Sequence, residues 1–158
     1  MDIKINLGES HRLRKIGAFN FNNLYEEMRE WIDNHKYEFD EKGFTSKDLD
    51  TGKEIIVDWI GEREITDEMK YIFKINFLLK KILPAGEDLV KGIIEISFKA
   101  NLEVDYRKKW GQTKLSNFLF NLYTNYIIKQ ENKRHYGKLY NEITELHDLA
   151  KEVLEFYK

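Results

Sequence analysis

Histidines and carboxylates that could bind a metal ion are present in this chain, but they are not spaced as metal ligands usually are. The four histidines (His11, His35, His135 and His147) are scattered, with no H-x-H and no H-E-x-x-H pattern. The best candidate pair is Glu131 with His135, one helical turn apart. Two ligands do not make a site, and a solvated helix face is the ordinary interpretation. We therefore predict no metal and no cofactor.

Nucleophilic catalysis is also unsupported by the residue pattern. The chain has no cysteine, which excludes a disulfide, a thiolate nucleophile and a Cys-ligated zinc or iron–sulfur site. Its serines lie outside G-x-S-x-G and S-x-x-K, and no glycine-rich phosphate loop is present. We predict no catalytic residue and a protein that is not an enzyme.

Two pairs of carboxylates have a spacing that suits acid–base work or cation binding. Glu62 with Glu64, and Glu103 with Asp105, are two residues apart and so share one face of a strand. On the water side of a half-exposed sheet, however, such charges are the usual complement to a buried face. We interpret them as solubilising residues.

Asp58 has apolar neighbours, Ile56 and Ile60, on the same face of its expected strand. If that face is covered, the carboxylate needs a partner, because an unpaired buried charge is costly. Lys74 and Lys99 are the candidates, so an ion pair is expected there.

A run of cations beside a tryptophan is the one place where charge departs from neutral mixing. Arg107, Lys108, Lys109 and Trp110 stand together, with Lys114 close behind. They are a candidate contact for an anion: cations for a phosphate or lipid head group, and the ring for a base or an interface. The other interpretation is a solvated corner between a strand and a helix.

The overall charge does not favour nucleic acid or a membrane as partner. With 26 basic and 28 acidic residues the formal net charge is −2, so any such binding must come from a local patch. The N-terminus lacks the apolar core of a signal peptide, and no apolar run approaches the length of a membrane span. We expect a cytoplasmic protein, and 158 residues favour one domain, 1–158.

The clearest structural pattern is the strand expected over Ile94–Tyr106. Apolar and polar residues alternate throughout it, which gives one face for a core and one for water. We expect this strand to be central in an antiparallel sheet. Its water side, with that of the preceding strand, should be exposed and should carry Lys74, Asn76, Lys80, Glu95, Ser97, Lys99 and Glu103.

The remaining elements complete an α+β layout. We expect a short N-terminal strand ended by Gly8, an irregular basic segment, and a helix from Phe21 to about His35 that begins at Asn22 or Asn23. Its buried stripe should be Leu24, Met28, Trp31 and Ile32. A four-stranded antiparallel meander follows, with turns at residues 50–53, at 66–68 and at 84–87, the last around the only proline, Pro84.

A long C-terminal helix, or a helical hairpin split near Gly137, should pack on one face of the sheet. Its first part places Leu115, Phe118, Leu119, Leu122 and Tyr126 on one side. Its second part has the spacing of a coiled-coil seam, with Leu139, Ile143, Leu146 and Val153 as the candidate interaction residues. The partner is either this domain's own sheet and helix or a second copy of the chain.

Two functions remain open from the sequence. The first is a non-enzymatic protein-interaction or assembly module, in which the partner is another protein or a second copy bound through the C-terminal helix. The alternative is a binder of an apolar small molecule or lipid between a curved sheet and the long helix, a layout similar to that of helix-grip folds. Aromatic side chains would then line a cavity; otherwise they fill the core.

Overall fold

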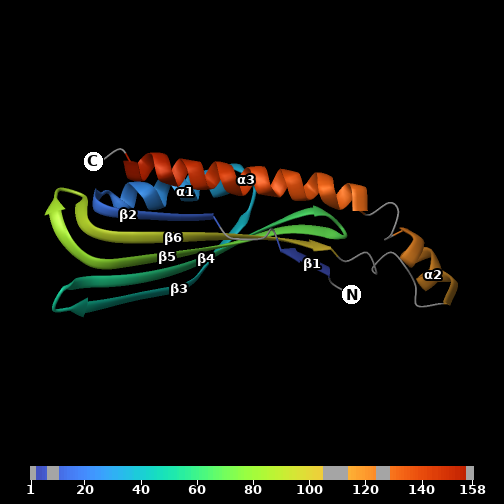
Figure 1. Ribbon diagram of the computed structural model, residues 1–158, viewed down its shortest axis with the longest axis horizontal. Coiled ribbons are helices and arrows are strands. Elements are labelled where there is room, and N and C mark those ends of the chain that lie inside the picture. The colour runs from blue at the N-terminus through green and yellow to red at the C-terminus, as the bar shows by residue number, and fades with distance from the viewer. Residues whose placement is uncertain (1–2, 7–10, 105–113, 124–128, 156–158) are drawn as a thin grey trace.

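A computed structural model describes residues 3–6, 11–104, 114–123 and 129–155 of the chain. These residues form an α+β fold, as expected (Figure 1). The strands are β1 (Ile3–Asn6), β2 (His11–Phe19), β3 (Glu38–Leu49), β4 (Gly52–Thr66), β5 (Met69–Gly86) and β6 (Leu89–Val104). The helices are α1 (Phe21–Asn34), α2 (Lys114–Tyr123) and α3 (Lys129–Glu155).

The strands form one antiparallel sheet in the order β1-β6-β5-β4-β3, with β2 also paired to β6. The predicted meander β3 to β6 is confirmed, and Gly52, with φ of 130°, forms part of the first turn as expected. Both N-terminal strands pair with the same edge of β6. Asn6 lies opposite Asn101 and His11 lies opposite Phe98, so β1 and β2 follow one another along a single neighbour.

The prediction of an irregular segment before α1 was wrong, because His11–Phe19 forms β2. Its inward face starts with His11, Leu13 and Lys15, while Ile16 points outward and is 67% exposed. Alternation in β2 therefore does not follow hydrophobicity, and the usual sequence signal of a half-buried strand is absent.

Helix α1 carries the chain from one edge of the sheet to the other. It connects β2, beside β6, with β3 at the far edge. Its 14 residues give a length of about 21 Å, close to the roughly 19 Å spanned by four inter-strand spacings. Asn20, not Asn22 or Asn23, is the N-cap: its Oδ1 accepts a hydrogen bond from the Asn23 backbone N–H at 3.0 Å. The expected stripe of four buried residues is confirmed.

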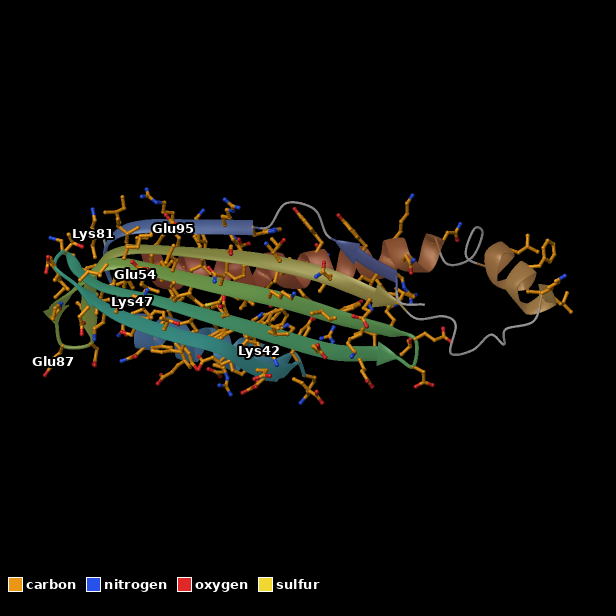
Figure 2. All side chains as sticks on the ribbon, turned by 90° about the horizontal axis from the view of Figure 1, so that it is seen from below. Lys42, Lys47, Glu54, Lys81, Glu87 and Glu95 are labelled. Atoms are coloured by element: carbon orange, nitrogen blue, oxygen red, sulfur yellow. The ribbon has the colours of Figure 1, made fainter. Side chains whose placement is uncertain are left out.

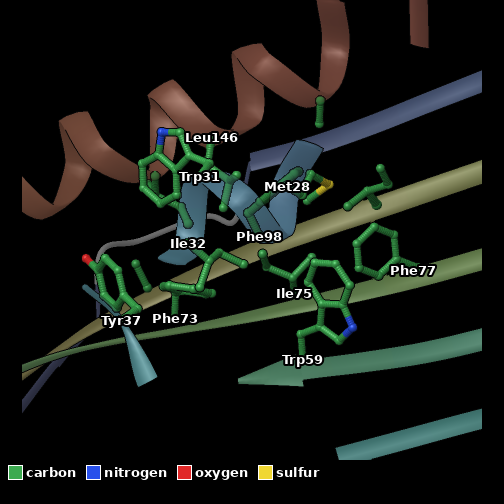
Figure 3. Close-up of a cluster of buried hydrophobic side chains, with 14 of the residues drawn as sticks. Met28, Trp31, Ile32, Tyr37, Trp59, Phe73, Ile75, Phe77, Phe98 and Leu146 are labelled. Carbon is green, nitrogen blue, oxygen red and sulfur yellow. The ribbon is translucent and has the colours of Figure 1, made fainter. Parts of the chain in front are cut away.

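The core lies between one face of the sheet and the helices α1 and α3 (Figure 3). The alternating apolar residues of β6 from Ile94 to Val104 are all buried, as predicted. Large side chains from β4 and β5 fill the space opposite them, and each of these is at most 1% exposed: Trp59, Tyr71, Phe73, Ile75 and Phe77.

The opposite face of the sheet has no helix on it in the described part of the chain (Figure 2). Lys74, Lys80 and Lys99 are exposed, and the other residues expected on this face are partly exposed. The prediction that this face meets water, with charges of both signs, is confirmed.

The third turn lies further along the chain than predicted, because β5 continues through Pro84 to Gly86. Pro84 pairs with Val90 of β6, whereas the pairing of β4 with β5 ends at Ile82. Proline is tolerated there because the side of β5 that faces away from β6 has no strand to receive an N–H.

The two C-terminal helices differ in what they cover. Helix α3 runs without a break through Gly137 and packs on β6, β2 and α1. Helix α2 lies apart, past the end of the sheet (Figure 1), and does not show the packing expected for it. None of the described helices combines the length and the apolar character needed to cross a membrane.

Substitution of alanine for glycine should have opposite effects on stability at Gly61 and Gly137. A Cβ at buried Gly61 would overlap the ring of Phe73, whereas a Cβ at Gly137 meets nothing within 4 Å. Gly61→Ala should therefore lower the free energy of unfolding by about 1–3 kcal/mol. Gly137→Ala should raise it by about 0.5–1 kcal/mol, because it removes a glycine from a helix interior. Urea unfolding measures both, and equal stability of the two variants would contradict this packing.

Candidate functional site

A bidentate ion pair joins the sheet to the middle of α3. Arg63 of β4 contacts Glu142 of α3 through Nη1–Oε1 at 2.8 Å and Nη2–Oε2 at 2.9 Å. Arg63 Nη1 also donates to the His35 carbonyl oxygen at 2.7 Å. The two side chains are 22% and 17% exposed. A planar, mostly buried pair of this kind orients the two elements as well as neutralising the charges.

Two tyrosines complete this cluster. The guanidinium of Arg63 lies 4.7 Å from the ring centre of Tyr37 and 5.1 Å from that of Tyr71. Burial, with Glu142 close by, raises the pKa of Tyr71 to about 12 and raises that of Tyr37 still further above its ordinary value. Both phenols therefore stay protonated near neutral pH, and neither provides a phenolate base or nucleophile.

His135, the histidine of the candidate metal-binding pair, is buried against the same cluster. Its Nδ1 is hydrogen-bonded to the Tyr71 hydroxyl at 2.7 Å. No group of three or more potential metal ligands exists among the described residues. His135 is thus a core histidine in a hydrogen bond, the ordinary interpretation for such a residue.

A second set of contacts attaches α3 to β2. The Nε2 of His11 lies 3.0 Å from the Thr144 hydroxyl, and the rings of His11 and His147 are 5.3 Å apart. Further along, Lys15 donates from Nζ to the carbonyl oxygen of Leu154, near the end of α3. A cation at the C-terminal end of a helix binds carbonyls that have no partner inside the helix. The polar residues on the inward face of β2 are therefore used to hold α3.

The outer face of the sheet holds three of the four carboxylates that were considered for acid–base chemistry, Glu62, Glu64 and Glu103, whereas Asp105 lies outside the described residues. Glu62 and Glu64 share that face, and Glu62 lies 3.5 Å from Lys70 Nζ. Asp58 is exposed and accepts a hydrogen bond from Asn76 Nδ2, the residue opposite it on β5. The expected ion pair with Lys74 or Lys99 is absent, because the face is open and the carboxylate needs no charged partner.

Two hollows lie on this outer face, of about 520 Å³ and 310 Å³. The larger is lined by Lys42, Asp58, Lys74 and Lys99 among others, and the smaller contains Arg12, Arg14 and Glu95. Several charges are already balanced: Lys42 contacts Asp40 at 2.5 Å, and Arg14 contacts Glu95 at 3.1 Å. This mixture of signs selects neither an anion nor a cation, and it is typical of a solvated sheet face.

The candidate site is the exposed apolar face of α2. Leu115, Phe118, Leu119 and Leu122 follow the helical spacing i, i+3, i+4, i+7, as predicted. They are 69%, 59%, 41% and 40% exposed, respectively. Scattered apolar residues are normal on a protein surface, but four on one helix face form a patch of the kind that marks an interaction site.

The two sets of residues proposed from the sequence have different outcomes. Leu139, Ile143 and Leu146 lie in the core of this chain with at most 4% exposure, and Val153 packs partly buried against that core. Of the two expected partners, these residues therefore pack on the sheet and helix of their own chain and not on a second copy. Arg107, Lys108, Lys109 and Trp110 lie outside the described residues, as does Tyr126.

Comparison with known proteins adds no relative: the chain matches no protein-family model and no curated protein.

The buried ion pair leads to a stability prediction. Glu142→Ala leaves the Arg63 guanidinium mostly buried without its carboxylate, and it should lower the free energy of unfolding by about 2–4 kcal/mol. Replacing both residues, Arg63→Met with Glu142→Leu, should cost less than Glu142→Ala alone, since no buried charge is then left unpaired. Urea unfolding of the three proteins tests this. A double variant less stable than Glu142→Ala would contradict the argument.

The contact between β2 and α3 predicts a dependence on pH. Burial, with His147 beside it, lowers the pKa of His11, an effect that Asp148 partly offsets. The folded protein therefore binds a proton at His11 less readily than the unfolded chain does. This contribution to stability is complete above the unfolded pKa of about 6.5 and is lost as the pH falls through that value towards the folded pKa.

His11→Gln keeps a polar group near Thr144 but does not titrate. Its stability relative to the original protein should therefore improve between about pH 7.5 and pH 5. Urea unfolding along this pH series measures the difference. Parallel stability curves for the two proteins would show that His11 carries no such linkage.

Proposed function

We propose that this protein is a non-enzymatic interaction module, in which a rigid body of sheet and two helices presents α2 to another molecular surface. The observation that carries the proposal is the exposure of four large apolar side chains on one face of α2. The contacts of Arg63, His135 and Lys15 attach elements of the fold to one another. They support a structural role for the polar groups inside the domain.

The position of α2 supports its role as the contact element. Helices α1 and α3 already cover the inner face of the sheet, and their apolar stripes are buried there. Helix α2 also has an apolar stripe but lies past the end of the sheet (Figure 1). The i, i+3, i+4, i+7 pattern is the one that amphipathic helices use when they bind grooves or interfaces.

The sequence suggested that the C-terminal helix, α3, is the interaction element, whereas we place the interaction on α2. A seam through α3 would need Leu139, Ile143 and Leu146 to face a second copy, and their burial within the chain argues against it. An apolar ligand between sheet and helix is equally poorly supported. The rings that would line its cavity pack against one another instead: Tyr37 with Phe73 at 4.7 Å between ring centres, and Trp59 with Phe77 at 4.7 Å.

The test separates a contact helix from a core helix. The double variant Leu115→Ser with Phe118→Ser should change the free energy of unfolding by less than about 1 kcal/mol, because these side chains are mostly exposed. It should also bind less of a dye that fluoresces on apolar protein surfaces. The matched control is Leu146→Ala, which removes a fully buried side chain and should cost about 2–5 kcal/mol.

A double variant as unstable as Leu146→Ala would place α2 in the core and overturn the proposal. Unchanged dye binding would overturn it as well.

A further inference from the structure

The charge of the chain is divided between α2 with its flanks and the rest of the molecule. Residues 106–130 contain five basic residues and no acidic one: Arg107, Lys108, Lys109, Lys114 and Lys129. This leaves 21 basic against 28 acidic residues, a net charge of −7, for the rest of the chain. A molecule with a total charge of −2 thus contains a sequence segment of charge +5, and its exposed apolar helix lies within that segment.

We propose that α2 binds an anionic membrane surface, with its apolar face in the boundary between head groups and acyl chains. This inference rests on the proposed function, since it names the surface that α2 contacts. An apolar helix face combined with cations is the combination that interfacial helices use. Here the face is formed by Leu115, Phe118, Leu119 and Leu122, with Lys114 at the start of the helix.

The length of α2 fits a helix that lies on the membrane. Its 10 residues are about 15 Å long, half of the roughly 30 Å of a bilayer's hydrocarbon core. It therefore lies along the interface and does not cross it. The acidic remainder of the molecule is repelled by an anionic surface, which orients the protein with α2 towards the lipid.

Charge and residue type disfavour the other partners of this helix. Two α2 helices of different copies would bring together two segments of +5, so a symmetric contact between copies is repelled. Single-stranded nucleic acid would satisfy the cations, but it binds through rings that stack on bases. Among the described side chains of α2, three of the four exposed apolar ones are leucines, which cannot stack in this way.

The experiment is co-sedimentation of the full chain with two kinds of lipid vesicle. One is phosphatidylcholine alone, and the other contains roughly a third phosphatidylserine. We expect binding to the anionic vesicles in about 0.05 M salt, much weaker binding in about 0.5 M salt, and little binding to the neutral vesicles at either salt concentration.

The apolar arm compares two double variants of matched exposure. Leu115→Ser with Phe118→Ser should lower the partition coefficient roughly tenfold or more. The control is Ile16→Ser with Phe44→Ser, which removes side chains that are 67% and 59% exposed elsewhere, against 69% and 59% on α2. The control should bind the vesicles as the original protein does.

The charge arm uses single reversals. Lys114→Glu changes the charge of α2 by two units and should weaken binding roughly 25-fold, at about fivefold per unit charge near the surface. Its control is Lys91→Glu, at an exposed residue near the start of β6. The start of this strand lies at the end of the sheet away from α2 (Figure 1). That variant should lower binding much less, and circular dichroism checks that all variants are folded.

The outcomes separate this inference from the proposed function. One outcome is that the protein does not bind vesicles but self-associates at high concentration, and that Phe118→Ser abolishes this self-association. It would overturn the proposal of membrane binding but keep α2 as a contact helix. Salt-dependent binding of single-stranded nucleic acid, without binding of vesicles, would also overturn the proposal of membrane binding. Equal vesicle binding by the two double variants would show that α2 is not the element that binds.

Discussion

The packing of α3 on the inner face of the sheet is the interaction on which the rest of this structure depends. The sheet has one apolar face, and α1 alone is too short to cover strands as long as β5 and β6. Helix α3, with 27 residues, covers the remainder. The Arg63–Glu142 pair holds its middle on the sheet, and Lys15 binds a carbonyl near its end. Because apolar packing is not directional, these polar contacts determine where along the sheet the helix lies.

This arrangement uses the polar groups that might otherwise have supported chemistry. The buried Tyr71 and His135 are hydrogen-bonded to one another, and His11 contacts Thr144 on α3. Burial holds the tyrosine pKa values far above neutrality, so these phenols are unsuited to proton transfer. On the outer face, Glu62 and Glu95 form ion pairs with Lys70 and Arg14, and Asp58 accepts a hydrogen bond from Asn76. The interior of the domain is thus a stable support, and we place its function on the surface.

Because two other helices cover the sheet, the apolar face of α2 has no surface to pack on among the residues that the structure describes. Its apolar residues follow the helical spacing, as those of α1 do, yet Leu115 and Phe118 remain more than half exposed. Residues 106–130, the sequence segment that contains α2, include five basic residues and no acidic one, so this segment has a charge opposite to that of the rest of the chain. An apolar helix face in a cationic segment suits a contact that needs both burial and attraction to an anionic surface.

Alternation in the sequence by itself determined the meander and the buried face of β6, because any cover over a sheet buries every second residue. The helical spacing likewise determined the stripe of α1. Only the tertiary structure revealed β2, since the partners of its inward His11 and Lys15 lie 133 and 139 residues away. It also decided that the stripe of α3 is buried and that of α2 exposed. Periodicity shows that a helix has an apolar face, but what covers that face depends on which elements already occupy the sheet.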